Sequence, residues 1–249
     1  MTSVAIENLS VKYGDFYAVK NISFTVEEGE IFGFLGANGA GKTTTIRVLC
    51  GLLIPSEGQA VVGGVNVESD PFAVKKKVGY MSQKFTLYDD MTVAENLSFA
   101  ASLRKLDDGF FKEQKKRLLD FIHFAQSTDS LVRDLPGGIK QQVSLIASLL
   151  HDPEIVFLDE PTAGVSPAFR QRFWELIRQL ADARKTVFVT THYMDEAEQC
   201  GRIALMRDGE LIALDAVDNL KMDSFPNKKP KDVHLEDVFI NIVEGTKHD

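Results

Sequence analysis

The chain has few cysteines, no excess of positive charge and no long hydrophobic run. Its two cysteines, Cys50 and Cys200, do not have the spacing of a metal site or a redox motif, which is typical of buried thiols in a reducing compartment. The net charge of −8 provides no basic field for a nucleic-acid backbone, so we expect no nucleic-acid partner. Apolar runs fall far short of the ~18–20 residues that span a bilayer, and the N-terminus does not have the pattern of a secretion signal. We therefore expect a compact, soluble protein whose membrane role must come from a partner.

The pattern of hydrophobic residues predicts an α/β fold. Strands are predicted over Val4–Leu9, Ile22–Val26, Glu30–Leu35, Ile155–Leu158 and Thr186–Thr190. Helices are predicted over Lys42–Cys50, Val93–Lys105, Phe110–Ala125, Pro167–Ala183 and His234–Val243. A hairpin is predicted over Gly201–Leu214 and a loop over Lys221–Lys231. The alternation of strands and amphipathic helices indicates βαβ connections and a parallel sheet.

A glycine-rich segment, GANGAGKT at residues 36–43, lies between a predicted strand and a predicted helix. Glycines are needed there because the backbone N–H groups must line a tight concavity around phosphates, where a Cβ would obstruct the turn. Lys42 supplies a positive charge, and the hydroxyl of Thr43 is placed to contact Mg²⁺. The segment therefore predicts a nucleoside-triphosphate site built by Gly36, Asn38, Gly39, Ala40, Gly41, Lys42, Thr43 and Thr44.

Two adjacent carboxylates follow the predicted strand in the segment IVFLDE, at residues 155–160. In a doubly wound sheet the end of this strand lies near the phosphate loop, so Asp159 is predicted to hold Mg²⁺ and Glu160 to act as general base on the attacking water. His192 follows the next predicted strand and is expected at the same edge. Taken alone, the acids fit a helix cap and His192 fits a cap for the segment after it, and Gln83 has the same ambiguity.

These motifs together resemble the nucleotide-binding domain of ABC transporters over nearly the whole chain, in the expected order. The resemblance implies that Tyr13 stacks on adenine, that Gln83 contacts nucleotide and Mg²⁺, and that His192 is a catalytic switch histidine. It implies a P-loop NTPase core with a mainly parallel sheet and an N-terminal antiparallel β subdomain. We also expect one domain over residues 1–249, with an inserted α-helical subdomain at about 84–150 and a C-terminal extension at about 215–249.

The same resemblance implies a dimer, in which each ATP lies between one phosphate loop and the signature helix of the other subunit. Residues 135–142 match the signature region, so Gly137 and Gly138 are expected to face the γ-phosphate bound to the partner. The segments THYMDEAEQCGRIALMRDGELIALD and HLEDVFINIV resemble ATPase subunits of ABC-2 type efflux systems, including drug exporters. We therefore expect an ATPase that powers export through a separate transmembrane permease, at the cytoplasmic face of the inner membrane.

The sequence departs from the family pattern in two places. The signature reads LPGGI, so Pro136 and Ile139 replace the usual serine and glutamine, and the loss of an N–H and a hydroxyl could each cost about 1.5–3 kcal/mol of phosphate contact. Proline suits the first turn of a helix, so the helix start and both glycines can survive. Ser166 stands where the family commonly has aspartate. The changed signature predicts slower hydrolysis. Ser166 predicts weaker signalling between the two subunits, which would also lower turnover.

The sequence is compatible with three alternative functions. One is an ATP-binding clamp with little turnover, which the departures at Pro136 and Ser166 favour. Another is a non-transport ABC ATPase, although the chain shows neither a sustained heptad pattern nor an internal repeat. A P-loop kinase is the third, and it leaves the signature-like segment, Gln83 and His192 unexplained.

Overall fold

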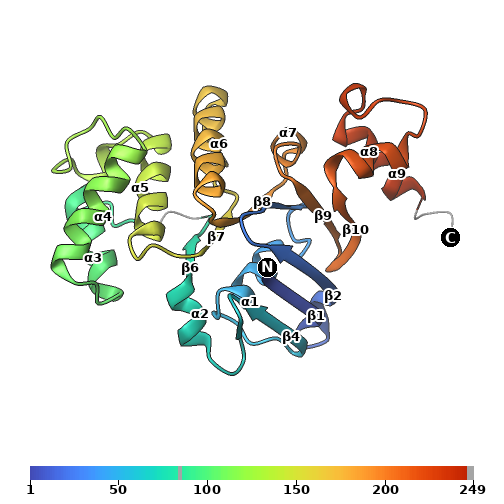
Figure 1. Ribbon diagram of the computed structural model, residues 1–249, viewed down its shortest axis with the longest axis horizontal. Helices are drawn as coiled ribbons and strands as arrows, with labels where there is room; N and C mark the ends of the chain where they lie inside the picture. Colours follow the sequence, from blue (N-terminus) through green and yellow to red (C-terminus); the bar gives the residue numbers. More distant parts are fainter. Residues whose placement is uncertain (84–85, 246–249) are drawn as a thin grey trace.

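The structure, a computed structural model, describes residues 1–83 and 86–245, with side chains described to residue 242, and holds two sheets with helices around them (Figure 1). An antiparallel sheet has the order β2 (Phe16–Glu27), β1 (Thr2–Tyr13), β4 (Glu57–Val62), β5 (Val65–Asn66). A larger sheet has the order β10 (Glu210–Ala216), β9 (Arg202–Arg207), β3 (Ile31–Leu35), β8 (Thr186–Thr191), β7 (Ile155–Asp159), β6 (Val78–Met81). Neighbouring strands in this sheet are parallel, except for the antiparallel pair β9 and β10, as the predicted fold class requires.

The helices connect these strands and form groups beyond both edges of the larger sheet (Figure 1). In chain order they are α1 (Lys42–Leu49), α2 (Pro71–Lys77), α3 (Val93–Leu103), α4 (Asp108–Phe121), α5 (Gly137–Leu149), α6 (Pro167–Asp182), α7 (Met194–Ala197), α8 (Val217–Ser224) and α9 (Leu235–Gly245). Two 3₁₀ turns are η1 (Val132–Asp134) and η2 (Pro230–Asp232). Helices α3–α5 gather beyond β6, where a helical subdomain is expected, whereas α8 and α9 gather beyond β10. The subdomain boundaries themselves stay predictions, and residues 84–85 of the expected insertion lie outside the described residues.

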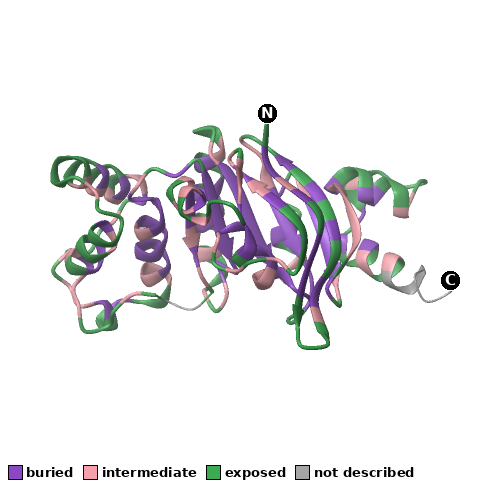
Figure 2. Ribbon diagram, turned by 90° about the horizontal axis from the view of Figure 1, so that it is seen from below, coloured by how far each residue is buried: buried purple, intermediate pink, exposed green. Residues whose placement is uncertain are grey.

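Successive side chains of a strand point to opposite faces of the larger sheet, and other elements cover both faces, so both sets of side chains are buried. In β7, Ile155 and Phe157 pack with α1 and the antiparallel sheet, while Val156 and Leu158 pack with α5 and α6. Phenylalanines fill the space between the two sheets; the rings of Phe32 and Phe188, for example, have centroids 5.0 Å apart. Figure 2 shows the resulting continuous buried interior across the strands. The rigid sheet provides a fixed frame for the loops at its edge.

The structure differs from the sequence-based assignments in one predicted loop and in three elements that the sequence did not predict. The predicted loop Lys221–Lys231 is partly helical, because α8 extends to Ser224 and η2 begins at Pro230. Lys221 is buried and its ammonium lies 2.8 Å from the Glu198 carboxylate, a tertiary contact that its polar neighbours in sequence do not reveal. The strands β4 and β5 and the helix α2 were not assigned from the sequence, because their short polar segments show weak periodicity.

Candidate functional site: a phosphate loop at the carboxyl edge of the sheet

Three parallel strands place the predicted site residues at one edge of the sheet. β3 lies next to β8 with Leu35 opposite Thr191, and β7 lies next to β8 with Asp159 opposite Thr190. The segments that leave these three strands therefore begin at the same level. The phosphate loop, the carboxylate pair and the segment with His192 meet there although they are far apart in the sequence.

The phosphate loop has the backbone conformation that its glycines were expected to provide. Gly39 and Gly41 have φ angles of 84° and 106°, which side-chain-bearing residues rarely adopt. A Cβ on Gly36 would lie 2.3 Å from the backbone oxygen of Met206, so any larger residue would displace the loop from β9. Ala40 lies beneath the loop, buried, and its carbonyl accepts a hydrogen bond from Gly209. The loop is thus fixed from below and leads directly into α1.

Lys42 is the buried cation of this loop. Its side chain is 4% exposed, and its ammonium donates to the carbonyl oxygens of Gly36 at 2.8 Å and Ala37 at 3.1 Å. The ammonium also lies 3.6 Å from the carboxylate of Glu160. Burial lowers the pKa of Lys42, and the negative charges of Glu160 and Asp159 act in the opposite direction. An anion such as a phosphate would further favour the charged form.

Asp159 is the carboxylate that the sequence predicts to hold Mg²⁺. Its Oδ1 accepts hydrogen bonds from the hydroxyls of Thr43 at 3.2 Å and Thr190 at 2.7 Å. Its Oδ2 is buried and has no hydrogen-bond partner among the described residues. A buried oxygen without a partner is costly, and it fits a cation bound by one carboxylate, a hydroxyl and substrate phosphates. The described residues contain no cluster of three His, Cys, Asp or Glu side chains that could hold a metal.

Glu160 lies at the junction of three motifs. It is 8% exposed, and its carboxylate lies near the ammonium of Lys42, accepts from the side-chain amide of Gln83 at 2.9 Å and lies 3.3 Å from Nδ1 of His192. Its backbone has a φ of 47°, and its N–H donates to the Thr190 hydroxyl at 2.9 Å. A hydrogen bond at this strained position aims the carboxylate into the site. Gln83, Glu160 and His192 are therefore brought together, as predicted.

A pocket of about 550 Å³ lies above the phosphate loop. Of the predicted residues, Tyr13, Asn38, Gly39, Gly41, Lys42, Thr43, Thr44, Gln83 and Glu160 line it. Tyr13 is half exposed at the end of β1 and pairs across the hairpin with Phe16, which also lines the pocket. Gly36, Ala40, Asp159 and His192 do not line it. Gly36, Asp159 and His192 nevertheless contact lining residues, namely Lys42, Thr43 and Glu160.

Sequence reasoning missed three residues of this site, Phe16, Ala18 and Thr190, and Ala18 has no distinguishing side chain. Phe16 carried a signal, because an exposed aromatic close to Tyr13 in a hairpin is a candidate base-stacking group. Thr190 carried none, since its hydroxyl matters only because β8 is the neighbour of β7. It joins the backbone of Glu160 to the carboxylate of Asp159.

The predicted signature glycines lie apart from this pocket. Gly137 and Gly138 open α5, and among the described residues nothing lies within 4 Å of a Cβ built on Gly137. A Cβ on Gly138 would lie 2.5 Å from the ring of Phe169 in α6, so the second glycine permits close helix packing. Ser166 caps α6, its hydroxyl accepting from the N–H of Phe169 at 3.4 Å. Neither glycine lines the pocket of its own chain.

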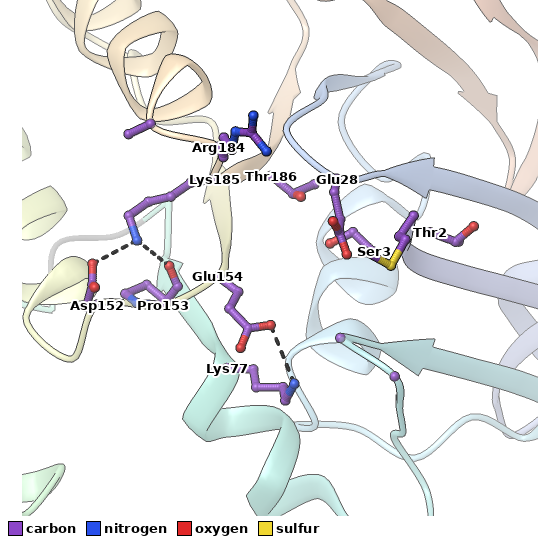
Figure 3. A pocket seen from close by; sticks show the side chains of 14 residues that line it. Thr2, Ser3, Glu28, Lys77, Asp152, Pro153, Glu154, Arg184, Lys185 and Thr186 are labelled. Atoms are coloured by element: carbon purple, nitrogen blue, oxygen red, sulfur yellow. Dashed lines mark hydrogen bonds and ion pairs between the residues drawn. The ribbon is translucent and has the colours of Figure 1, made fainter.

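Another hollow, of about 580 Å³, lies where β8 begins, away from the phosphate loop (Figure 3). Its lysines pair with its own acids, Lys77 with Glu154 at 3.5 Å and Lys185 with Asp152 at 2.8 Å. These charges are already compensated, so we assign no ligand to it.

The sequence and the fold of the chain match those of known proteins. Residues 19–163 match the family described as ABC transporter. A relative named probable multidrug ABC transporter ATP-binding protein YbhF, of Escherichia coli (strain K12), is 42% identical over 97% of this chain, which spans 42% of that protein's length. The linearmycin resistance ATP-binding protein LnrL of Bacillus subtilis (strain 168) is 37% identical to this chain. The matched region covers 84% of this chain and 67% of LnrL. A dimeric ATP-binding cassette bound to ADP and Pi has the same fold, with a TM-score of 0.77 at 24% identity over 86% of this chain and 98% of its own.

Proposed function

Because the chain belongs to the ABC transporter family, we propose that it binds and hydrolyses ATP to power transport through a separate transmembrane permease. The observation that carries the proposal is the position of Glu160, whose carboxylate lies near Lys42, Gln83 and His192 beside the phosphate-loop pocket. A general base must lie within hydrogen-bond reach of the water that it deprotonates, and neighbouring groups must hold it in position. Glu160 lines the pocket, and its carboxylate contacts Gln83 and His192, which supports this role.

In the proposed reaction, the backbone N–H groups of the loop and the ammonium of Lys42 bind the β- and γ-phosphates. The incoming phosphate competes with Glu160 for the ammonium, which leaves the carboxylate free to accept a proton from water. His192, at 3.3 Å, orients the reacting groups. Tyr13 stacks on the adenine ring. Thr43, Gln83 and Asp159 would hold Mg²⁺, which would neutralise charge on the phosphate oxygens.

We propose further that two copies, or this chain and a second ABC ATPase domain, close on the nucleotides. The exposed start of α5 supports this, because Gly137 and Gly138 present backbone N–H groups away from their own pocket. Pro136 at the N-cap provides no side-chain oxygen for phosphate, which favours slow turnover.

Export is the proposed direction, since one relative is named for multidrug transport and another for linearmycin resistance. None of the described helices is long and apolar enough to cross a membrane. We also propose that the chain acts at the cytoplasmic face of the inner membrane, attached through the permease.

The test is Mg-ATP hydrolysis by the purified chain, wild type beside Glu160→Gln, with nucleotide binding measured on both. The amide keeps the size of the side chain and loses its basicity, so we expect turnover to fall at least about 100-fold while binding persists. The matched control is Glu154→Gln, an exposed acid at the opposite end of β7, which should turn over like the wild type. Binding without turnover in the wild type would favour the clamp, which the departures at Pro136 and Ser166 suggest.

A further inference from the structure

A buried carboxylate behind the site has no role in the proposed reaction so far. Glu196 lies in α7 and is 1% exposed. Its Oε1 accepts from the hydroxyl of Thr162, its Oε2 accepts from the hydroxyl of Thr191 at 2.7 Å, and Nε of Arg170 lies 3.2 Å from Oε1. Removing a carboxylate from water is costly unless it is paired and hydrogen-bonded, and here both oxygens are engaged.

The partners of Glu196 come from three different segments at the carboxyl edge of the sheet. Thr162 follows β7 and lies two residues after Glu160. Thr191 ends β8 and directly precedes His192. Arg170 lies in the first turn of α6. One carboxylate therefore joins the segment that holds the proposed base to the segment that holds the histidine.

A chain of side-chain contacts reaches His192 from the same cluster. The guanidinium of Arg170 lies 4.1 Å from the ring centroid of Tyr193, and the centroids of Tyr193 and His192 are 4.1 Å apart. The N–H of Tyr193 donates to the Thr191 hydroxyl at 3.0 Å, which fixes the backbone next to His192. On its other side, His192 Nδ1 lies 3.3 Å from Glu160.

We propose that Glu196 is a positioning residue that sets the separation between His192 and Glu160, an inference that rests on the proposed function. Thr162 and Thr191 approach its two oxygens from the two segments, so the length and direction of the carboxylate define their spacing. Arg170 neutralises the buried charge and also supports the ring of Tyr193. Among the described residues, none of these four side chains lines the nucleotide pocket, so their effect on the reaction passes through His192 and Glu160.

The alternative is that Glu196 only stabilises the fold. The two roles predict different kinetics, because a less stable protein loses active molecules while each remaining molecule keeps its kcat and KM. A positioning residue instead lowers the kcat of fully folded protein and leaves KM unchanged, since the pocket is intact. A misplacement of about 1 Å far from the chemistry can lower a rate by about 100-fold.

The experiment measures kcat, KM and the thermal midpoint of the full chain for Glu196→Gln and for Thr162→Val and Thr162→Ser. We expect Glu196→Gln to lower kcat by about 10-fold or more with KM within about 3-fold of wild type. Thr162→Val, which removes the hydroxyl at nearly constant volume, should act in the same direction. Thr162→Ser keeps the hydroxyl and should restore kcat to within about 2-fold of wild type.

Asp195→Asn is the matched control, because Asp195 is the neighbouring acid and its carboxylate also contacts Arg170, at 3.3 Å, but it is exposed and does not bridge the two segments. It should retain the wild-type kcat. The inference is overturned if Glu196→Gln keeps the wild-type kcat, if Asp195→Asn loses as much, or if Thr162→Ser is as slow as Thr162→Val. Glu160-dependent turnover at the wild-type kcat in Glu196→Gln overturns the inference alone, whereas a wild type without Glu160-dependent turnover overturns the proposed function and the inference together.

Discussion

Ser166 offers a prediction in which a departure from the family pattern has a measurable structural effect. Its backbone is extended, with φ of −64° and ψ of 154°, and its hydroxyl accepts from the N–H of Phe169, which caps the first turn of α6. Replacing a serine N-cap by alanine typically costs about 1 kcal/mol, within a range of about 0.5–2 kcal/mol. The hydrogen bond here is long, at 3.4 Å, so we expect Ser166→Ala to lower the free energy of unfolding by about 0.5–1 kcal/mol.

For a chain of this size, that loss corresponds to a thermal midpoint lower by about 1–4 °C. Ser166→Asp keeps an oxygen acceptor at the exposed N-cap and adds a negative charge at the positive end of the helix, so it should be at least as stable as the wild type. Ser98→Ala is the control, because Ser98 is exposed within α3 and alanine is a better helix former there.

The assay is equilibrium unfolding in urea of the full chain without nucleotide, with equal m-values required across the variants. Ser98→Ala should raise the free energy of unfolding slightly while Ser166→Ala lowers it. The capping argument fails if Ser166→Ala unfolds at the wild-type midpoint, or if Ser166→Asp is less stable than Ser166→Ala. Because stability is measured without nucleotide, a change in turnover in Ser166→Asp can be assigned separately to contacts between subunits.

Further predictions concern the phosphate loop and a partly buried histidine. Gly36→Ala forces a Cβ to 2.3 Å from the Met206 backbone oxygen, and we expect urea unfolding to show about 1–3 kcal/mol of destabilisation together with weaker ATP binding; unchanged values for both would contradict the clash. Burial, with help from the charge of Arg104, lowers the pKa of His151 to about 4, whereas in the unfolded chain it is about 6.5. As pH falls from about 6.5 to about 4, the unfolded chain gains a proton that the folded chain lacks, so folding stability declines, and His151→Gln should make urea midpoints fall less between pH 7 and pH 5.

The sequence predicted the parts of the site that lie directly at strand ends. Gly36–Thr43 follows β3, Asp159 ends β7 with Glu160 directly after it, and His192 follows β8. Hydrophobic runs predicted these strands, and the glycine-rich motif and the adjacent acids then indicated which strand ends carry the site. Parallel strands bring their carboxyl ends to one edge, and a general rule of α/β sheets then places the motifs together. The roles of these residues in catalysis stay predictions, but their proximity is a property of the structure.

The order of the strands could not be predicted in the same way. β3 pairs with β8, more than 150 residues later, and with β9, while β6 is an edge strand beside β7. No local pattern encodes such long-range pairing, because each strand would bury its apolar faces equally well beside another neighbour. For the same reason the sequence did not reveal that the predicted loop from Lys221 begins in a helix held to Glu198.

The residues that adjust the site depend on this hidden information. The Thr190 hydroxyl donates to Asp159 and accepts from the backbone of Glu160, which it can do only because β8 lies beside β7. Glu196, which does not line the pocket, joins the same two segments through Thr162 and Thr191. Phosphate-binding residues occur at fixed intervals along the chain, so a sequence motif reveals them. Residues that set the distance between two loops can lie anywhere in the sequence, because only their positions in the folded protein matter. Side chains of the second kind are found from the structure, by asking which buried polar atoms connect two strands that both end at the site.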